Sequence, residues 1–222
     1  MELSTPENLQ IIDHLLMTTR SVRKRLDLTR TVEHAVIEQC IDVAVQAPTG
    51  GNRQGWHFMV VTDEAKRARI GELYRQSFEL YRGTSDQPIN DPTDDLPNVD
   101  QMRRVVSSSR YLAQHMHEVP VMIIPCIEGE VTDINGFRIA SLYGSILPAA
   151  WSLMLALRSR GIGSAWTTLH LRYETEVAQL LGIPDGVMQA ALLPVAYYTG
   201  DDFKPAKRVP ASERTYWNGW GS

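Results

Sequence analysis

Cysteine is scarce in this chain of 222 residues, which contains only Cys40 and Cys126. The two lie far apart without a CxxC spacing, and each has apolar neighbours, which is typical of buried free thiols. This usage suits a reducing, cytoplasmic compartment. His115 and His117 are two residues apart and would project from different faces of a helix, so we expect no metal site there.

An excess of positive charge is also missing, because 22 lysines and arginines stand against 26 aspartates and glutamates, for a net charge of −4. Such a chain is not built to coat nucleic acid or an anionic membrane. Long apolar runs are missing as well. Asp13 and His14 interrupt the first one, so we expect no signal peptide, and the longest run, 146–157, is shorter than the roughly 20 residues that span a bilayer. We therefore expect no nucleic acid and no membrane as partner.

Two common nucleotide-binding motifs are absent from the sequence. No GxGxxG follows a strand and opens a helix, and no GxxxxGK[ST] occurs. A Rossmann dinucleotide site and a P-loop are therefore not supported.

Apolar periodicity predicts helices and strands that do not strictly alternate. Thr31 is expected to cap the second helix, and a helix over 137–160 is apolar nearly all round. The pattern indicates one α+β domain over 1–222, with a mixed, mostly antiparallel sheet of four to five strands flanked by helices. The predicted strands are 56–62, 119–127, 163–168 and 187–200.

Two segments stand outside this pattern. Residues 83–100 contain three prolines and five aspartates, which favours a lid or a flexible loop. Residues 201–222 carry Trp217 and Trp220 without a helical pattern. A tail rich in aromatic side chains is rarely left in water, so we expect it to dock as an arm, for example on a partner subunit.

The first of three polar clusters is a basic run near the start of the chain. Arg20, Ser21, Arg23, Lys24 and Arg25 bring four cations within six residues of an otherwise acidic chain. The planar donor fork of arginine fits phosphate, and Ser21 adds a hydroxyl donor. A solvated basic face is the alternative, and this run alone favours it.

The second cluster is the turn "APTGGNRQGWHF", residues 47–58. Gly50 and Gly51 permit positive φ and a close approach of backbone to a ligand, and Thr49, Asn52 and Gln54 offer donors and acceptors. Such a turn can present N–H and amide groups to a heteroaromatic edge. An ordinary Pro/Gly turn between helix and strand is the alternative.

The third cluster is Trp166, Thr167 and Thr168, where an indole and two hydroxyls could hold a polar ring by stacking and hydrogen bonding. A β-branched strand is the alternative. Lys207 and Arg208 add late cationic charge. Together the clusters describe a ligand with a phosphate at one end and a polar ring at the other, for which flavin mononucleotide (FMN) is the economical candidate.

The order of these motifs resembles the FMN-dependent nitroreductase-like family over most of the chain. The motifs are "RSVRKR", "APTGGNRQGWHFMVV", "LALRSRGIGSAWTT" and "KRVP", and "WTTLHL" with "PAKRVP" is most similar to the iodotyrosine-deiodinase-type branch. The resemblance implies an intertwined α+β homodimer with FMN at the subunit interface. The helix over 137–160 would then be dimer core, and the tail would reach over the partner.

The resemblance also implies roles for individual residues. Those that match the family would bind the phosphate and ribityl chain, line the isoalloxazine, or lie near the ring. In that order they are Arg20, Ser21, Arg23 and Arg208; Pro48, Thr49 and Gly50; and Trp166, Thr167 and Thr168. Asn52 matches a position that is often polar in the family, and any of Asn52, Arg53 and Gln54 could be the residue that faces the flavin. The Thr168 hydroxyl or backbone would reach N5, and no residue need act as a classical acid or base.

The implied activity is that of an FMN-dependent oxidoreductase. NAD(P)H would reduce the flavin, which would then reduce a small aromatic or electron-poor acceptor, such as a nitro compound or quinone, in a ping-pong cycle. One alternative is a reductive dehalogenase or another metabolite-specific flavin enzyme, although residues 74–104 show no matching substrate clamp. The other is a flavin-binding or sensing protein with little turnover.

Overall fold

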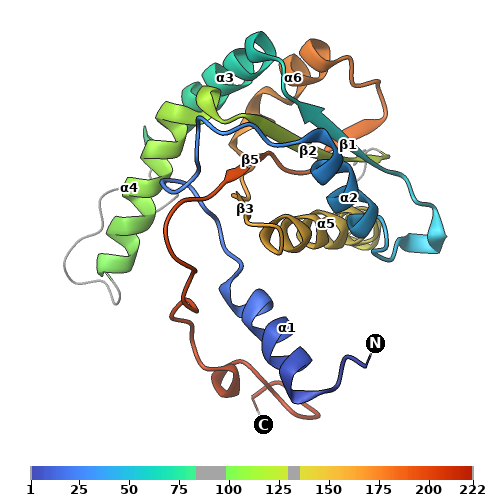
Figure 1. Cartoon of the computed structure of the whole chain (residues 1–222). Helices are drawn as coiled ribbons and strands as arrows, with labels where there is room; N and C mark the ends of the chain where they lie inside the picture. The colour runs from blue at the N-terminus through green and yellow to red at the C-terminus, as the bar shows by residue number, and fades with distance from the viewer. Residues whose placement is uncertain (1, 84–98, 130–135, 222) are drawn as a thin grey trace. The chain divides into compact units, whose positions relative to one another are not determined.

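The computed structural model describes residues 2–83, 99–129 and 136–221 (Figure 1). The chain divides into two compact units, of which the larger spans Arg20–Gly200. The smaller combines Met1–Thr19 with Asp201–Ser222. Each unit is described by itself below.

An antiparallel sheet of five strands forms the centre of the larger unit. Its strands follow the order β1-β2-β5-β3, and β4 also pairs with β2. Seven of the eight residues of β2 are buried, which explains the continuous apolar run in this part of the sequence. The α+β prediction is therefore confirmed. The strands are β1 (Trp56–Val61), β2 (Val121–Glu128), β3 (Ile162–Ser164), β4 (Val187–Gln189) and β5 (Leu193–Tyr197).

Helices cover both sides of this sheet. Figure 1 shows α2 (His34–Ala44) and α5 (Gly136–Arg158) together on one side, with α3 (Glu64–Gly83) and α6 (Glu174–Leu181) on the other. The main core lies between α2, α5 and the sheet. Its fully buried members include Ile37, Cys40, Ile123, Leu153, Leu157, Leu193 and Val195. The remaining helices are α1 (Pro6–Thr18) in the smaller unit and α4 (Val99–His115) in the larger one.

The start of α2 differs from the sequence prediction, since the helix begins at His34 and not after a Thr31 cap. The Asp27 carboxylate accepts hydrogen bonds from the N–H groups of Thr29 and Arg30. These bonds close a turn of the Asx type, which competes with helix formation. Thr31 follows this turn in irregular backbone, and the helix begins at His34 without a side-chain cap.

The last two predicted strands are shorter than expected. The strand predicted over 163–168 ends at Ser164, and the one predicted over 187–200 is divided into β4 and β5. The reason is a change of partner, because Ala190 N–H donates to the Pro125 carbonyl while Leu192 exchanges two backbone bonds with Thr167. Thr167 thus forms an isolated bridge outside a regular strand.

The helix α5 is partly buried and partly exposed. Length and composition alone would allow it to cross a membrane, but eight of its 23 residues are buried in the protein core. Its exposed apolar residues include Phe137, Leu147 and Trp151, at 81%, 37% and 40% exposure. The predicted burial therefore holds for one face, and another face presents apolar side chains to solvent.

The two irregular segments have different outcomes. Residues 84–98 lie outside the described residues, so the lid over 83–100 stays a prediction. The tail belongs to the smaller unit, and its described residues, 201–221, contain only the short 3₁₀ helix Ala211–Glu213. Within this unit Asp202 pairs with His14, and the Tyr216 and Trp220 rings stack at 4.6 Å.

Candidate functional site

The basic segment after α1 is fixed against strand β3. Val22 donates its N–H to the Ser164 carbonyl at 2.8 Å, and the Val22 side chain is buried. Gly163 makes this approach possible, since a Cβ there would lie 3.0 Å from Val22 Cβ and 3.2 Å from Leu26 Cδ2. The glycine therefore allows the polar residues around Val22 to be held beside the sheet.

Arg23 is the most enclosed of the predicted phosphate ligands. Its guanidinium Nη1 lies 3.4 Å from Ser108 Oγ on α4, and burial lowers the pKa of Arg23. The same cation interacts with Tyr74, a buried residue of α3. Arg20 lies exposed at the start of the segment, and Ser21 is half-buried.

Tyr74 joins two of the predicted site segments. Burial raises the pKa of Tyr74 to about 12, so the phenol is neutral at physiological pH, and the nearby Arg23 cation and Thr167 side chain each lower that pKa. The structure thereby brings Arg23 and Thr167 together through a residue that sequence reasoning missed. In the sequence, Tyr74 lies four residues after the apolar Ile70 on the same helix face, which indicates only an ordinary core side chain.

The three residues of the Trp-Thr-Thr cluster have different environments. Trp166 is half-buried and packs against the main core. The Thr167 hydroxyl donates to the Leu192 carbonyl at 2.9 Å, so it is already engaged. Thr168 is exposed at the start of the 3₁₀ helix Leu169–Tyr173, and its hydroxyl has no hydrogen-bond partner among the described residues. Thr168 is therefore the member whose hydroxyl is available to a ligand.

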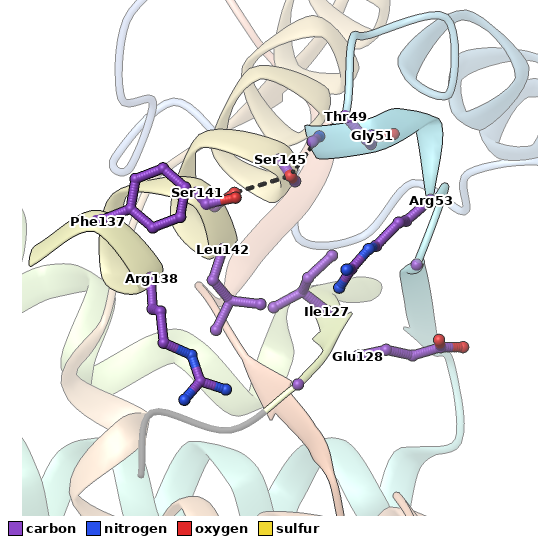
Figure 2. Close-up of a pocket in the computed structure, with 13 residues that line it drawn as sticks. Thr49, Gly51, Arg53, Ile127, Glu128, Phe137, Arg138, Ser141, Leu142 and Ser145 are labelled. Carbon is purple, nitrogen blue, oxygen red and sulfur yellow. Dashed lines mark hydrogen bonds between the residues drawn. The ribbon is translucent and has the colours of Figure 1, made fainter. Parts of the chain in front are cut away.

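The turn after α2 is tightly built. Gly51, Asn52 and Gln54 have φ values of 59°, 53° and 53°, and the left-handed region is costly for residues other than glycine. Gln54 N–H donates to Thr49 Oγ1 at 3.1 Å. Gly50 N–H donates to Ser145 Oγ, also at 3.1 Å (Figure 2). The internal bonds occupy most of the N–H groups that the sequence suggested for ligand binding.

A pocket of about 800 Å³ lies between this turn, the end of β2 and the start of α5 (Figure 2). This volume is in the usual range of small-molecule sites. Ile127, Phe137 and Leu142 give it apolar surface, and Arg53 and Arg138 give it charge. The other lining residues are Thr49, Gly50, Gly51, Gly55, Glu128, Gly129, Ser141 and Ser145.

The predicted site residues do not all line this pocket. Thr49 and Gly50 do, whereas Pro48 and Asn52 are exposed neighbours of its lining. The described lining contains neither the arginine segment 20–23 nor the cluster 166–168. Arg208 belongs to the smaller unit, where it is exposed and its Nη1 lies 3.4 Å from the Lys207 carbonyl oxygen.

A model of the nitroreductase family matches residues 16–197, a range that contains the basic segment, the turn and the Trp-Thr-Thr cluster. The chain belongs to the nitroreductase family. It is therefore an oxidoreductase of this family, and the predicted resemblance is confirmed.

Other nitroreductase-family chains show how far the similarity extends. A relative from Archaeoglobus fulgidus, named for NADH dehydrogenase or NAD(P)H nitroreductase activity, is 27% identical over 86% of this chain and 92% of its own. The iodotyrosine deiodinase of Drosophila melanogaster is 28% identical over 73% of this chain and 54% of its own length.

Two solved structures share the nitroreductase fold. An FMN-dependent nitroreductase from Mycobacterium smegmatis in complex with NADPH has a TM-score of 0.67, with 22% identity over 95% of this chain and 99% of that one. An iodotyrosine deiodinase bound to FMN and 3-iodo-L-tyrosine has a TM-score of 0.66, with 20% identity over 93% and 98%.

The turn after α2 depends on Ser145, which gives a first prediction. Replacing Ser145 with alanine removes the acceptor for Gly50 N–H and the bond from Ser145 Oγ to the Ser141 carbonyl. We expect a loss of about 1–2 kcal/mol of stability, measured by urea unfolding. Ser141→Ala is the control, because that residue takes part through its backbone carbonyl. Equal stability of Ser145→Ala and the parent would contradict the assigned role.

His170 gives a second prediction, on pH dependence. It is fully buried, neither ring nitrogen has a hydrogen-bond partner among the described residues, and burial lowers its pKa to about 3. An unfolded histidine titrates near pH ~6.5, so the unfolded state gains the proton first as the pH falls. Stability should therefore decline below about pH 6.5, by on the order of 1–2 kcal/mol between pH 7 and pH 5.

The test compares urea unfolding of the parent, His170→Leu and His34→Leu at pH 7 and pH 5. His34 is an exposed histidine on α2 and serves as the control. We expect the loss between the two pH values to shrink in His170→Leu and to persist in His34→Leu. An unchanged loss in His170→Leu would exclude His170 as its cause.

Proposed function

We propose that this chain is an FMN-dependent oxidoreductase that uses NAD(P)H to reduce a small aromatic or electron-poor acceptor, such as a nitro compound or a quinone. One observation carries the proposal. The buried Tyr74 lies close to both Arg23, from the basic segment, and Thr167, from a segment about 140 residues later in the chain, since both affect its pKa. The family resemblance assigns both segments to the same flavin.

The donor set on this side of the protein fits the phosphate end of FMN. Arg20, Ser21 and Arg23 offer two guanidinium groups and a hydroxyl, which suit a phosphate dianion. Arg23 is enclosed by α3 and α4, so its charge is screened less than that of an exposed side chain. The family resemblance adds Arg208 to the proposed phosphate ligands.

The residues 166–168 would bind the ring end of the cofactor. We assign Trp166 to packing beside the flavin and the exposed Thr168 to a hydrogen bond near N5. Thr167 would hold the segment in place through its side-chain and backbone bonds to Leu192. When bound, FMN supplies the electron-transfer chemistry between NAD(P)H and the acceptor, and the protein binds, orients and shields it.

A second copy of the chain would complete each site. The turn residues Pro48, Thr49, Gly50 and Asn52 are assigned to the isoalloxazine, but the pocket beside them contains none of the phosphate ligands. A homodimer in which the turn of one subunit faces the flavin of the other would resolve this separation. The exposed apolar residues Leu147 and Trp151 of α5 support such an interface.

Reductive dehalogenation is a second candidate function. It is favoured by the similarity to the Drosophila melanogaster iodotyrosine deiodinase and to the deiodinase structure with 3-iodo-L-tyrosine. The chain shares the fold with these proteins, and its segment 84–98 lies outside the described residues. The two functions differ in the preferred acceptor, which is a nitroaromatic compound or quinone for the first and a halogenated aromatic compound for the second.

A cytoplasmic location is proposed with either function, supported by two buried free cysteines.

The visible spectrum of the purified protein, followed by anaerobic NAD(P)H titration, tests the proposal. We expect flavin absorbance, bleaching by NADH or NADPH, and reoxidation by nitroaromatics or quinones. Reoxidation by halophenols with release of halide would favour the dehalogenase. Bleaching without reoxidation by any acceptor would favour a flavin-binding or sensing protein, and a protein that stays colourless after FMN addition would refute FMN dependence.

A further inference from the structure

The pocket beside the turn has a positively charged lining. Arg53 enters from the turn and Arg138 from the first turn of α5, so that the two cations come from different walls (Figure 2). Neither guanidinium has an ion pair or side-chain hydrogen bond among the described residues, and both side chains are exposed.

The only carboxylate that lines the described pocket does not neutralise these arginines. Glu128 Oε1 lies 2.9 Å from His57 Nε2 on the neighbouring strand. In Figure 2 its carboxylate points away from Arg53 and Arg138. Two arginines and one carboxylate leave the described lining with a net positive charge, which attracts an anion to the site.

The other lining residues indicate the chemistry of the uncharged part of the ligand. Ile127, Leu142 and Phe137 provide apolar surface, and the Ser141 side chain adds a hydroxyl. A pocket of about 800 Å³ accepts a substituted aromatic ring. A planar guanidinium binds a carboxylate or phosphate with two parallel hydrogen bonds.

We infer that this pocket selects small aromatic molecules that carry an oxyanion, a carboxylate or a phosphate, through Arg53 and Arg138. The inference rests on the proposed function, because it names the class of molecule that meets the flavin from the turn side. The acceptor is then an anionic aromatic compound. The phosphates of the nicotinamide donor carry the same chemistry, and the experiment separates these two sources.

The experiment measures binding without turnover. Isothermal titration compares 4-nitrobenzoate with 4-nitrobenzamide, which have nearly the same shape but differ in charge, on the full-length protein with and without FMN. We expect the parent to bind the benzoate about tenfold more tightly, as a charge-assisted hydrogen bond predicts. Arg53→Gln and Arg138→Gln should each reduce this preference, and the double variant should abolish it.

Two further variants control for charge and fold. Lys66→Gln removes one positive charge from the exposed first turn of α3, outside the pocket lining, and should retain the preference. Arg53→Lys keeps the positive charge at this position and should retain part of the preference for 4-nitrobenzoate. A parent that binds both probes equally, or a double variant that keeps the preference, overturns the inference.

Anaerobic NADPH titration of the same variants identifies the source of the anion. Weaker NADPH binding in the double variant assigns the arginines to the donor phosphates, whereas unchanged NADPH binding assigns them to the acceptor. The outcome also separates the two proposals. A protein that prefers 4-nitrobenzoate but binds no FMN refutes the proposed function alone, and one that binds FMN without the preference refutes this inference alone.

Discussion

Replacing Arg23 with alanine is expected to weaken FMN binding by about 10- to 100-fold. The guanidinium is enclosed between α3 and α4, beside Tyr74 and 3.4 Å from Ser108 Oγ. A cation that is already desolvated in the protein loses little further hydration when it binds phosphate, so its contribution exceeds that of an exposed charge. Quenching of flavin fluorescence on titration with the protein measures the dissociation constant.

Lys24→Ala is the matched control for this result. Lys24 is the next residue, it carries the same charge, and its Nζ lies exposed at 2.7 Å from Ser107 Oγ on α4. We expect its loss to change FMN affinity by about threefold at most. Equal effects of the two substitutions would indicate a general electrostatic field, and full FMN affinity in Arg23→Ala would refute the phosphate assignment.

A methyl group added at Gly163 is expected to destabilise the protein by about 1–3 kcal/mol and to weaken FMN binding as well. The new Cβ would lie 3.0 Å from Val22 Cβ and 3.1 Å from Val22 Cγ1, closer than such atoms normally approach. The basic segment must then move away from β3, and the bond from Val22 N–H to the Ser164 carbonyl is strained. Urea unfolding and FMN titration measure the two effects.

A double-mutant cycle with Val22→Ala tests the cause of this loss. Removing the Val22 methyl groups leaves room for part of the displacement, so the double variant should lose less stability than the sum of the two single variants. Additive losses would show that Gly163 acts through something other than contact with Val22.

The sequence predicted the sheet and most helices because their signals are local. The apolar run of β2 corresponds to seven buried residues, and Gly182 ends α6 in the left-handed conformation, with φ of 68°. The two errors have different causes. Asp27 forms a local turn with Thr29 and Arg30 before α2, and Thr167 divides the last predicted strand through its long-range bonds to Leu192.

The candidate site was only partly accessible from the sequence. The basic segment and the turn were identified from their order along the chain together with the Trp-Thr-Thr cluster, because each cluster alone is also compatible with a solvated face or a simple connection. Tyr74 could not be recognised, since its role depends on tertiary contacts with Arg23 and Thr167. Ser145 was also missed, although it accepts the hydrogen bond from Gly50 N–H that we had expected to face a ligand.

The backbone of the turn determines which of its positions can be redesigned. Gly51, Asn52 and Gln54 adopt positive φ, so libraries at these positions should be limited to glycine, asparagine and similar residues. Arg53 lies between them with an ordinary right-handed conformation, φ of −71° and ψ of −26°. Every residue except proline, which would lose the bond from the Arg53 N–H to the Gly50 carbonyl, is therefore compatible with the backbone at this position, which makes it the preferred position for directed evolution of acceptor range.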